Sequence, residues 1–364
     1  MKTVGLTEMH GIAKECAKHP PKGLRYEPIK SVKSWKNHIF QSSALGVLDY
    51  FESERHDFIE APLFPILTTN KWIYTPANFE TAIGFNLLGL PTPRSIRKKA
   101  FEHIILKKNC LKLLFKSQAG LKTMLDNGLD SPSLVAKSGV LHPAIGRVDD
   151  HKVHFNSEII NILFVGEFFR KGGAHAVDAF IDLANEFSNI HLRICSESSL
   201  HTRNEKLRIH YLNKIHQHER ITIGAVDREV LLNRILPKSD IYLCPTYFET
   251  WGFSIQEAMA YGIPVIATEH FAIPEMITNE QDGFLIPTEQ FKFIRENKGY
   301  GVEHIPETFS NYLTSEVSKK LKLLINDFDL RKRIGTNALN RMRKDFSFEK
   351  RNKQLAKIYN LNGS

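Results

Sequence analysis

The feature that most constrains the fold is an alternation of short apolar runs with helix-patterned stretches, which begins near Ile159. The run IINILFVG, which ends at Gly166, is apolar throughout, as in a strand that is buried on both faces of a sheet. The stretch from Ala174 to Phe187 then places apolar residues at helical spacing. Further strands of this kind start near Ile190, Arg220, Asp240, Ile263 and Gly283. The alternation predicts an α/β fold with a parallel, doubly wound sheet that is covered on both faces.

The N-terminal half has weaker patterns, which predict a second, smaller α/β domain. Its strand candidates are KTVGL at the start, DFIEA from Asp57, KWIYT from Lys71, LKLLFK from Leu111 and SLVAKSGV from Ser133. The segment 141–152 combines turn formers with charge and has no periodicity, so we place the linker there. The predicted domains are therefore 1–145 and 153–345, and the end of the chain reads as helices.

Composition limits the class of protein and its partners. With 364 residues, 42% of them hydrophobic and 24% charged, the chain is a folded globular protein that is too long for one typical domain. Its four cysteines are far apart, which predicts neither a zinc site nor a disulfide framework and fits a reducing cytosol. We expect no signal peptide and no membrane span, since no apolar run is long enough. The net charge of +9 favours anionic partners.

The first candidate site is the stretch VGEFFRKGG, Val165 to Gly173, between a predicted strand and a predicted helix. Arg170 and Lys171 stand beside two glycines at the helix N-terminus, where free N–H groups and the helix dipole favour an anion. The stretch is neither a Walker loop nor a GxGxxG motif. It predicts a phosphate-binding loop, and a flexible loop with two solvated cations is the alternative.

The second candidate site lies in PTYFETWGFSIQEAMAYGIPVIAT, residues 245–268. Glu249 follows a predicted strand, and Glu257 is expected in the first turn of the next helix. Both carboxylates would then lie at the carboxyl edge of the sheet, where doubly wound folds bind ligands. A carboxylate accepts two hydroxyl hydrogen bonds, which suits a ribose or a sugar. Two alternatives stay open: Glu249 is a solvated loop residue, and Ser254 with Glu257 forms a capping box.

Together these two stretches resemble the nucleotide-sugar-binding half of retaining glycosyltransferases of family four, which have the GT-B fold. The resemblance rests on the RKGG loop and on P-x-x-x-E-x-x-G-F-x-x-x-E-A-M-A-x-G-x-P-V, in the order and spacing of that family. PEMITNEQDGFLIP and the final FSFEKRNKQLAKIY match as well, so the resemblance covers about residues 157–360. It implies two Rossmann-like domains with parallel sheets that face each other across a cleft, with the C-terminal helix 346–364 packed on the N-terminal domain.

The resemblance implies a role for each matching residue. Arg170 and Lys171 would hold the donor diphosphate and stabilise the leaving group, Glu249 would face the donor sugar, and Glu257 would bind the ribose hydroxyls. The other expected donor-binding residues, mostly through their backbone N–H groups, are Gly172, Gly224, Thr250, Trp251, Gly252 and Phe253. In the phosphate loop the chain departs from the family pattern, because Glu167 follows Gly166 where the family often has an arginine. The N-terminal half also lacks the family's glycine-pair loop that approaches the donor phosphates.

On the acceptor side, the family's histidine near the reacting carbon has no counterpart. The sequence there reads WIYTPANFE, in which Asn78 is a candidate substitute and an ordinary turn asparagine is the alternative. His10 is the other candidate, with a surface histidine as its alternative. Residues 94–116 alternate basic and apolar side chains. This pattern is typical of a segment that docks on an anionic membrane surface, or of a solvated helix face followed by a buried strand.

The resemblance implies an enzyme, a retaining hexosyltransferase that moves a sugar from a UDP- or GDP-linked donor to a hydroxyl of a glycan or glycolipid. No metal or other cofactor is expected, because two side-chain cations can neutralise the diphosphate. We expect a cytoplasmic protein, peripheral at the inner membrane face, and no nucleic-acid partner, since no recognisable module accompanies the charge. The alternatives are a catalytically weak nucleotide-sugar-binding GT-B protein and a nucleotide-sugar epimerase. An NAD-dependent oxidoreductase is disfavoured because the loop lacks a glycine fingerprint.

Overall fold

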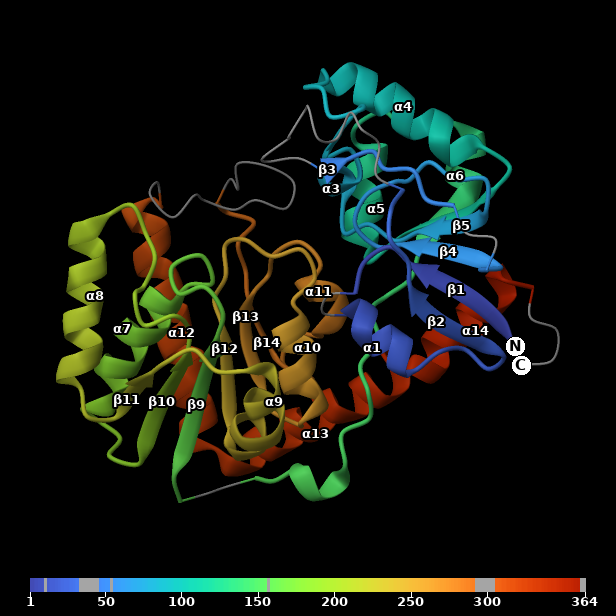
Figure 1. The fold of residues 1–364 in the computed structure, drawn as a ribbon. Coiled ribbons are helices and arrows are strands. Elements are labelled where there is room, and N and C mark those ends of the chain that lie inside the picture. The colour runs from blue at the N-terminus through green and yellow to red at the C-terminus, as the bar shows by residue number, and fades with distance from the viewer. Residues whose placement is uncertain (10–11, 33–45, 53–54, 156–157, 292–304, 361–364) are drawn as a thin grey trace. The chain divides into compact units, whose positions relative to one another are not determined.

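The computed structural model describes residues 1–9, 12–32, 46–52, 55–155, 158–291 and 305–360 (Figure 1). The chain forms two compact units. Unit 1 combines Met1–Gly146 with Phe346–Ser364, and unit 2 is Arg147–Asp345. The chain thus leaves unit 1 after Gly146 and returns to it at Phe346.

The core of unit 2 is a six-stranded parallel sheet with the strand order β11-β10-β9-β12-β13-β14. Its strands are β9 (Ile160–Val165), β10 (Ile190–Cys195), β11 (Ile221–Ile223), β12 (Ile241–Cys244), β13 (Val265–Thr268) and β14 (Phe284–Ile286). The chain moves from β9 outward to β11 and then returns to pair β12 with β9. The strand order therefore reverses between β9 and β12, which is where open α/β sheets bind ligands. The predicted parallel, doubly wound sheet is confirmed.

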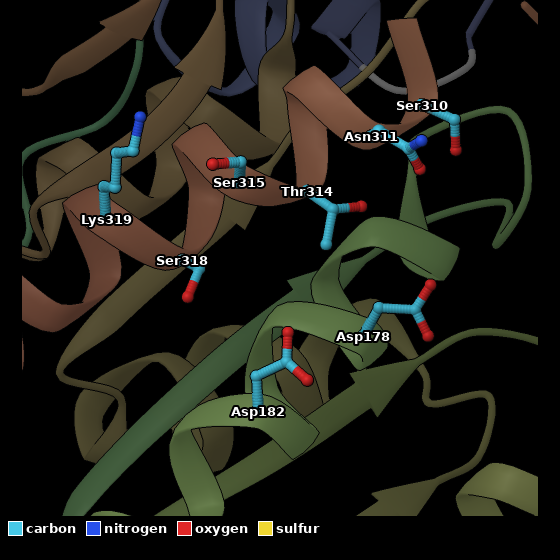
Figure 2. A pocket seen from close by; sticks show the side chains of 8 residues that line it. All are labelled: Asp178, Asp182, Ser310, Asn311, Thr314, Ser315, Ser318 and Lys319. Atoms are coloured by element: carbon cyan, nitrogen blue, oxygen red, sulfur yellow. The ribbon is translucent and has the colours of Figure 1, made fainter. Parts of the chain in front are cut away.

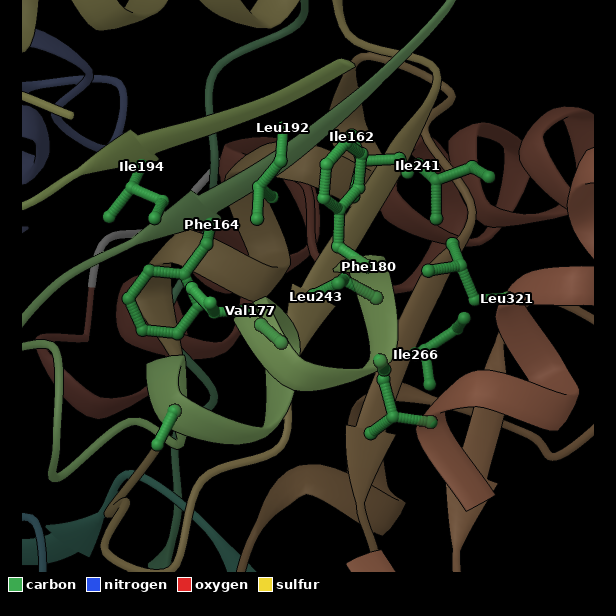
Figure 3. Close-up of a cluster of buried hydrophobic side chains, with 14 of the residues drawn as sticks. Ile162, Phe164, Val177, Phe180, Leu192, Ile194, Ile241, Leu243, Ile266 and Leu321 are labelled. Carbon is green, nitrogen blue, oxygen red and sulfur yellow. The ribbon is translucent and has the colours of Figure 1, made fainter. Parts of the chain in front are cut away.

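Helices complete unit 2. They are η1 (Asp150–Lys152), α7 (Gly173–Ala184), α8 (Glu205–Gln217), α9 (Arg228–Val230), η2 (Leu231–Ile235), η3 (Leu236–Lys238), α10 (Phe253–Ala260), α11 (Ile273–Met276), α12 (Glu307–Asn326) and α13 (Phe328–Asp345). Helices α7 and α12 pack against the strands, as Figure 3 shows for Val177, Phe180 and Leu321. These three side chains are fully buried. Burial of each such side chain contributes about 1.5–3 kcal/mol, so the packing holds the start of α7 firmly against the sheet.

Unit 1 also contains a six-stranded parallel sheet, in the order β2-β1-β4-β5-β7-β8. Its strands are β1 (Lys2–Leu6), β2 (Leu24–Pro28), β4 (Phe58–Ala61), β5 (Lys71–Tyr74), β7 (Cys110–Phe115) and β8 (Ser138–Val140), and β3 (Gly46–Val47) pairs separately with β6 (Phe85–Asn86). Its helices are α1 (Ile12–Lys18), α3 (Phe79–Ala82), α4 (Arg94–Leu106), α5 (Gln118–Leu125), α6 (Pro132–Lys137) and α14 (Phe348–Ile358). The last helix packs on the sheet through Leu355, next to Val4 and Leu6.

One predicted strand is largely wrong. Most of SLVAKSGV is the helix α6, and only Ser138–Val140 forms a strand. The helix starts at Pro132, whose fixed φ suits the first helical position, and Ser131 precedes it. Leu, Ala and Lys continue the helix, and this local preference overrides the apolar run.

The structure of the basic segment 94–116 fits the second interpretation, a solvated helix face followed by a buried strand. Helix α4 presents a stripe of exposed residues, Ile96, Lys99, His103 and Leu106, and the strand β7 that follows is largely buried. Several of its cations are used within unit 1. Arg97 donates to the carbonyl of Ile83, Lys98 to that of Asn127 and Lys112 to that of Ala136.

Candidate functional site

The loop after β9 is shaped by glycines. Gly166 has φ +120° and Gly172 has φ +79°, and both values lie in the region that favours glycine. A Cβ atom on Gly172 would lie 2.0 Å from the carbonyl oxygen of Pro245, in the loop after β12. The Thr246 hydroxyl donates to the carbonyl of Arg170 over 3.3 Å and joins the same two loops. The loops that follow the two central strands are therefore in direct contact.

Lys171 and Glu249 form an ion pair across these loops. The ammonium of Lys171 contacts Oε2 of Glu249, and it lies 3.4 Å from the carbonyl oxygen of Phe248. The two side chains retain only 14% and 12% of their exposure. An ion pair this enclosed interacts more strongly than a surface pair, because little water screens it. The basic residue of the first candidate site and the first acid of the second thus meet at one place.

Glu249 also receives hydrogen bonds from the backbone that follows it. Its Oε1 accepts from the N–H groups of Thr250 at 2.9 Å and Trp251 at 3.4 Å. The Trp251 ring is fully buried, and its Nε1–H donates to Oε1 of Gln256 at 3.0 Å. These contacts fix the loop just before α10, so the Glu249 carboxylate is held from both sides. The solvated-loop alternative for this residue does not fit its burial.

Arg170 lies beside this pair and is more exposed. Its Nε is 2.8 Å from Oε2 of Glu167, and the side chains are 44% and 42% exposed. The guanidinium also lies 5.2 Å from the centre of the Phe248 ring, which is within range of a cation–π contact. Glu167, which departs from the family pattern, therefore pairs with the exposed cation of the loop. Nothing in the sequence indicates this contact of Phe248 beyond the position of the residue next to Glu249.

Glu257 lies in the interior of α10 and is 5% exposed. The helix begins at Phe253 after Gly252, whose φ is +95°, and the cap of this helix uses no side-chain hydrogen bond. Ser254 is a helical residue, so the capping-box alternative is wrong. Glu257 lies beyond the first turn of α10, whereas the sequence predicts it within that turn. Because the cap adopts a left-handed conformation, glycine takes the position that a serine would otherwise occupy.

Arg228, which no motif singled out, pairs with Glu257. Its Nη1 contacts Oε1 of Glu257, and the arginine side chain remains 51% exposed. Arg228 begins α9, soon after Gly224, which follows β11. A Cβ atom on Gly224 would meet no other atom within 4 Å, so this backbone is open to a ligand. The pair joins the loop after β11 to the second acid of the site.

The two acids have a common buried neighbour, Tyr242 on β12. Burial raises the pKa of the Tyr242 phenol well above its ordinary value, and the charges of Glu249 and Glu257 add to the shift. Four predicted groups, Arg170, Lys171, Glu249 and Glu257, thus lie at the carboxyl ends of β9 and β12 or on the helices that follow. Thr250, Trp251, Gly252 and Phe253 connect the two acids along the chain.

The acceptor-side candidates lie in unit 1. Asn78 is 2% exposed and caps α3, with its Oδ1 accepting from the N–H of Thr81 at 2.8 Å. This position favours the alternative of an ordinary turn asparagine. His10 lies outside the described residues.

Several structural features bear on cofactors, membranes and cavities. The four cysteines are free and buried. In the described part of the chain, no three or more His, Cys, Asp or Glu side chains are grouped to hold a metal ion, and no helix is both long and apolar enough to cross a bilayer. A cavity of about 430 Å³ lies between α7 and α12, where Asp178 and Asp182 face hydroxyl side chains such as Thr314 (Figure 2). None of the predicted site residues lines it.

Comparison with known proteins shows what the part of the chain that carries the candidate site is similar to. Residues 160–295 match the family described as "Glycosyl transferases group 1". A "Capsular polysaccharide biosynthesis glycosyltransferase CapM" of Staphylococcus aureus is 25% identical over 58% of this chain and 48% of the relative. An "Uncharacterized 41.2 kDa protein in cps region" of Klebsiella pneumoniae is 27% identical over 64% of this chain and 63% of the relative. The matches thus span between about half and two thirds of these relatives.

Solved structures establish the fold over the whole chain. WaaG, "a glycosyltransferase involved in lipopolysaccharide biosynthesis", aligns with a TM-score of 0.60 at 16% identity over 99% of this chain and 100% of its own. Anabaena Alr3699/HepE, solved "in complex with UDP and glucose", gives 0.62 at 13% identity over the same shares. The chain has the GT-B fold, with a Rossmann-like parallel sheet in each unit, and the predicted fold class is confirmed. The part that carries the candidate site is the part that is similar to group 1 glycosyl transferases.

Proposed function

We propose that this protein is a glycosyltransferase of polysaccharide biosynthesis that moves a hexose from a nucleoside diphosphate sugar to a hydroxyl of a glycan or glycolipid. The observation that carries the proposal is the enclosed ion pair between Lys171 and Glu249 at the point where the strand order of unit 2 reverses. The family match over residues 160–295 and the names of the similar proteins, CapM and WaaG, support the same class.

The donor binds in unit 2. Glu257 accepts hydrogen bonds from the ribose hydroxyls, next to the open backbone at Gly224, and Glu249 accepts from hydroxyls of the transferred sugar. Lys171 and Arg170 bind the diphosphate together with the N–H groups at the start of α7, where the helix dipole favours negative charge. The backbone of Gly172, Thr250, Trp251, Gly252 and Phe253 lines the donor between these groups.

The chemistry follows from where charge develops. When the bond between the anomeric carbon and the diphosphate oxygen breaks, negative charge appears on the diphosphate. Lys171 and Arg170 are already in place to stabilise this charge, and such fixed groups act most strongly where water is excluded. Glu249 holds the Lys171 ammonium in position, and the Phe248 ring does the same for Arg170. We propose that these two cations neutralise the leaving group without a metal ion.

Retention of configuration belongs to the same proposal. The acceptor hydroxyl attacks from the face that the diphosphate leaves, and a phosphate oxygen of the leaving group accepts the hydroxyl proton. Unit 1 supplies the acceptor site. The product's anomeric configuration, read from its proton NMR coupling constant, tests this step directly, because an inverted product excludes it.

A thermal-shift screen of nucleoside diphosphates and their sugars tests the donor class. We expect UDP or GDP compounds to raise the melting temperature, in keeping with HepE, which was solved with UDP. At a hundredfold excess over Kd the stabilisation amounts to about 2.7 kcal/mol. Glu257→Ala should remove the shift, whereas Lys122→Ala, an exposed residue on α5, should not. If no nucleoside diphosphate stabilises the protein, the proposal fails.

An assay with and without an acceptor distinguishes a glycosyltransferase from two other functions. An epimerase would convert the donor with no acceptor present, and a binding protein without turnover would bind the donor but leave it intact. Neither has a specific observation in its favour. Incubation of the best-binding donor with and without a lipid-linked glycan, followed by chromatography of the nucleotides, distinguishes all three functions.

Attachment to an anionic membrane at the cytoplasmic face is part of the proposal for a lipid-linked acceptor. The exposed stripe of α4 supplies two apolar side chains, Ile96 at 48% and Leu106 at 37% exposure, with Lys99 between them. Apolar contact plus basic charge is the combination that docks helices on anionic lipids. The protein should co-sediment with vesicles that contain phosphatidylglycerol and not with neutral vesicles. Lys99→Glu should weaken this co-sedimentation, whereas Lys122→Glu should not. Equal binding to both kinds of vesicle would exclude this docking mode.

A further inference from the structure

A second polar cluster lies in unit 1, at the carboxyl edge of its parallel sheet. Glu60 is near the end of β4, Thr75 follows β5, and Lys116 follows β7. Arg351 reaches the same place from α14, although it is 291 residues away from Glu60. The carboxyl edge of a parallel sheet is where α/β folds bind their ligands, so the position itself is one that a substrate can use.

These four side chains and Cys16 line a small cavity of about 30 Å³. A cavity needs about 10–15 Å³ to hold one water molecule, so this one has room for a small polar group. The thiol of Cys16 is buried, and burial raises its pKa to about 11, so it contributes no negative charge near neutral pH. The wall of the cavity therefore combines two cations, one carboxylate and a hydroxyl.

The carboxylate in the wall is already satisfied. Oε1 of Glu60 lies 3.2 Å from Nη2 of Arg351, and its Oε2 accepts from the Tyr26 hydroxyl at 3.1 Å. Arg351 is only 7% exposed, and its Nη1 has no hydrogen-bond partner among the described residues. A buried charged donor without an acceptor is unfavourable, because it has lost its hydrogen bonds to water and has no protein hydrogen bond to replace them. Arg351 thus has one guanidinium nitrogen paired with Glu60 and one buried nitrogen that has no hydrogen-bond partner among the described residues.

The second cation strengthens the same preference. Burial lowers the pKa of Lys116, and the carboxylate charges of Glu8 and Glu60 act in the opposite direction. A group that carries negative charge in the cavity would stabilise both cations, whereas a neutral hydroxyl would leave the Lys116 charge poorly solvated. Arginine binds carboxylate and phosphate oxygens with well-defined geometry, and lysine adds a point charge.

We propose that this cavity in unit 1 binds one small oxyanion, a carboxylate or a phosphate carried by the acceptor. Nη1 of Arg351 and the ammonium of Lys116 donate to its oxygens, and the Thr75 hydroxyl supplies a further hydrogen bond. The link to an acceptor rests on the proposed glycosyltransferase function, whereas the oxyanion site itself does not. The acceptor is then an acidic glycan, either a uronic acid or a sugar or polyol phosphate.

Isothermal titration of the full chain with glucuronate, glycerol 3-phosphate and glucose tests the site. We expect at least one of the two anions to bind, glucose not to bind, and Lys116→Met to weaken the anion at least tenfold. Lys122→Met, which removes an exposed lysine of α5, is the matched control and should bind as the wild type does. Preference for glucuronate identifies a uronic acid as the source, and preference for glycerol 3-phosphate identifies a phosphate.

Thr75→Val gives a second variant, because it keeps the shape of the side chain and removes only the hydroxyl. It should weaken the anion several-fold with an unchanged circular dichroism spectrum. The proposal is overturned if neither anion binds better than glucose, or if both variants bind as the wild type does. Nucleotide thermal shifts on the same samples report on unit 2. A normal nucleotide shift without anion binding refutes this site alone, and anion binding without any nucleotide shift refutes the proposed function alone.

Discussion

Replacement of Lys171 by methionine separates the structural role of the Lys171–Glu249 pair from its chemical role. Methionine keeps the length of the side chain and removes its charge. The variant leaves Glu249 charged and only 12% exposed, with two backbone N–H groups as partners. Removal of one member of a fully buried pair costs about 3–5 kcal/mol, and the residual exposure places this variant near the lower end, at about 3 kcal/mol.

A double variant, Lys171→Met with Glu249→Gln, removes the unpaired charge. The glutamine Oε1 still accepts from the Thr250 N–H, which lies 2.9 Å from Oε1 of Glu249 in the wild type. We therefore expect chemical denaturation to show that most of the lost free energy of unfolding returns. Coupling of this kind is what double-mutant cycles measure for groups in contact.

The transfer rate should behave differently. Loss of one preorganised group that stabilises developing charge lowers kcat about 10²–10³-fold, or about 2.7–4 kcal/mol. Release of nucleoside diphosphate from the best-binding donor gives this rate. We expect Lys171→Met to lose it and the double variant not to recover it, although its stability returns. A double variant with wild-type turnover would refute a catalytic role for Lys171 and leave only a structural ion pair.

Two further predictions concern the same unit. Gly172→Ala places a methyl group against the carbonyl oxygen of Pro245 at a residue with φ +79°, so we expect a loss of about 2–4 kcal/mol in denaturation and weaker nucleotide binding, and a wild-type melting curve would contradict the close contact. Burial lowers the pKa of His175 from 6.5 to about 4, so the unfolded chain takes up a proton first as the pH falls. Stability should therefore drop between about pH 6.5 and pH 4, by about 3 kcal/mol at most, and His175→Gln should flatten this part of the pH profile.

The fold of unit 2 could be predicted because its local signals agree with one another. Short apolar runs such as Ile160–Val165 are too brief for helices and are flanked by glycine, so strand and helix are easily told apart. In Ser133–Val140 the signals disagree, since the two valines favour a strand while Pro132 starts a helix, and the predicted strand is wrong there. Helix starts were also misplaced where a left-handed glycine forms the cap, as at Gly252.

The partners of the site residues could not be predicted in the same way. Lys171 and Glu249 were found because each stands in a recognisable local stretch, but nothing in the sequence joins Arg228 to Glu257. That pair joins the start of α9, which follows β11, to α10, and apolar periodicity does not predict contacts between separate loops and helices. The pair of Glu60 with Arg351 depends on the return of the chain to unit 1 after Asp345, which is a still longer-range event.

Local motifs therefore predict the donor half of the proposed reaction, whereas the acceptor half depends on contacts between residues that are far apart in the sequence. Backbone contacts within and between two short motifs fix the proposed donor-side groups, above all the approach of Gly172 to Pro245. Proteins that share both motifs are therefore expected to share this arrangement. The family match covers residues 160–295, so it supports the proposed function only for the donor half. In unit 1 the charged residues Glu60, Lys116 and Arg351 come from separate strands and from the last helix, and no motif holds them together. If unit 1 binds the acceptor as proposed, substitution of one of them should alter the acceptor without disturbing any donor-side motif. We therefore expect chains that share the donor half to differ in acceptor through substitutions in unit 1.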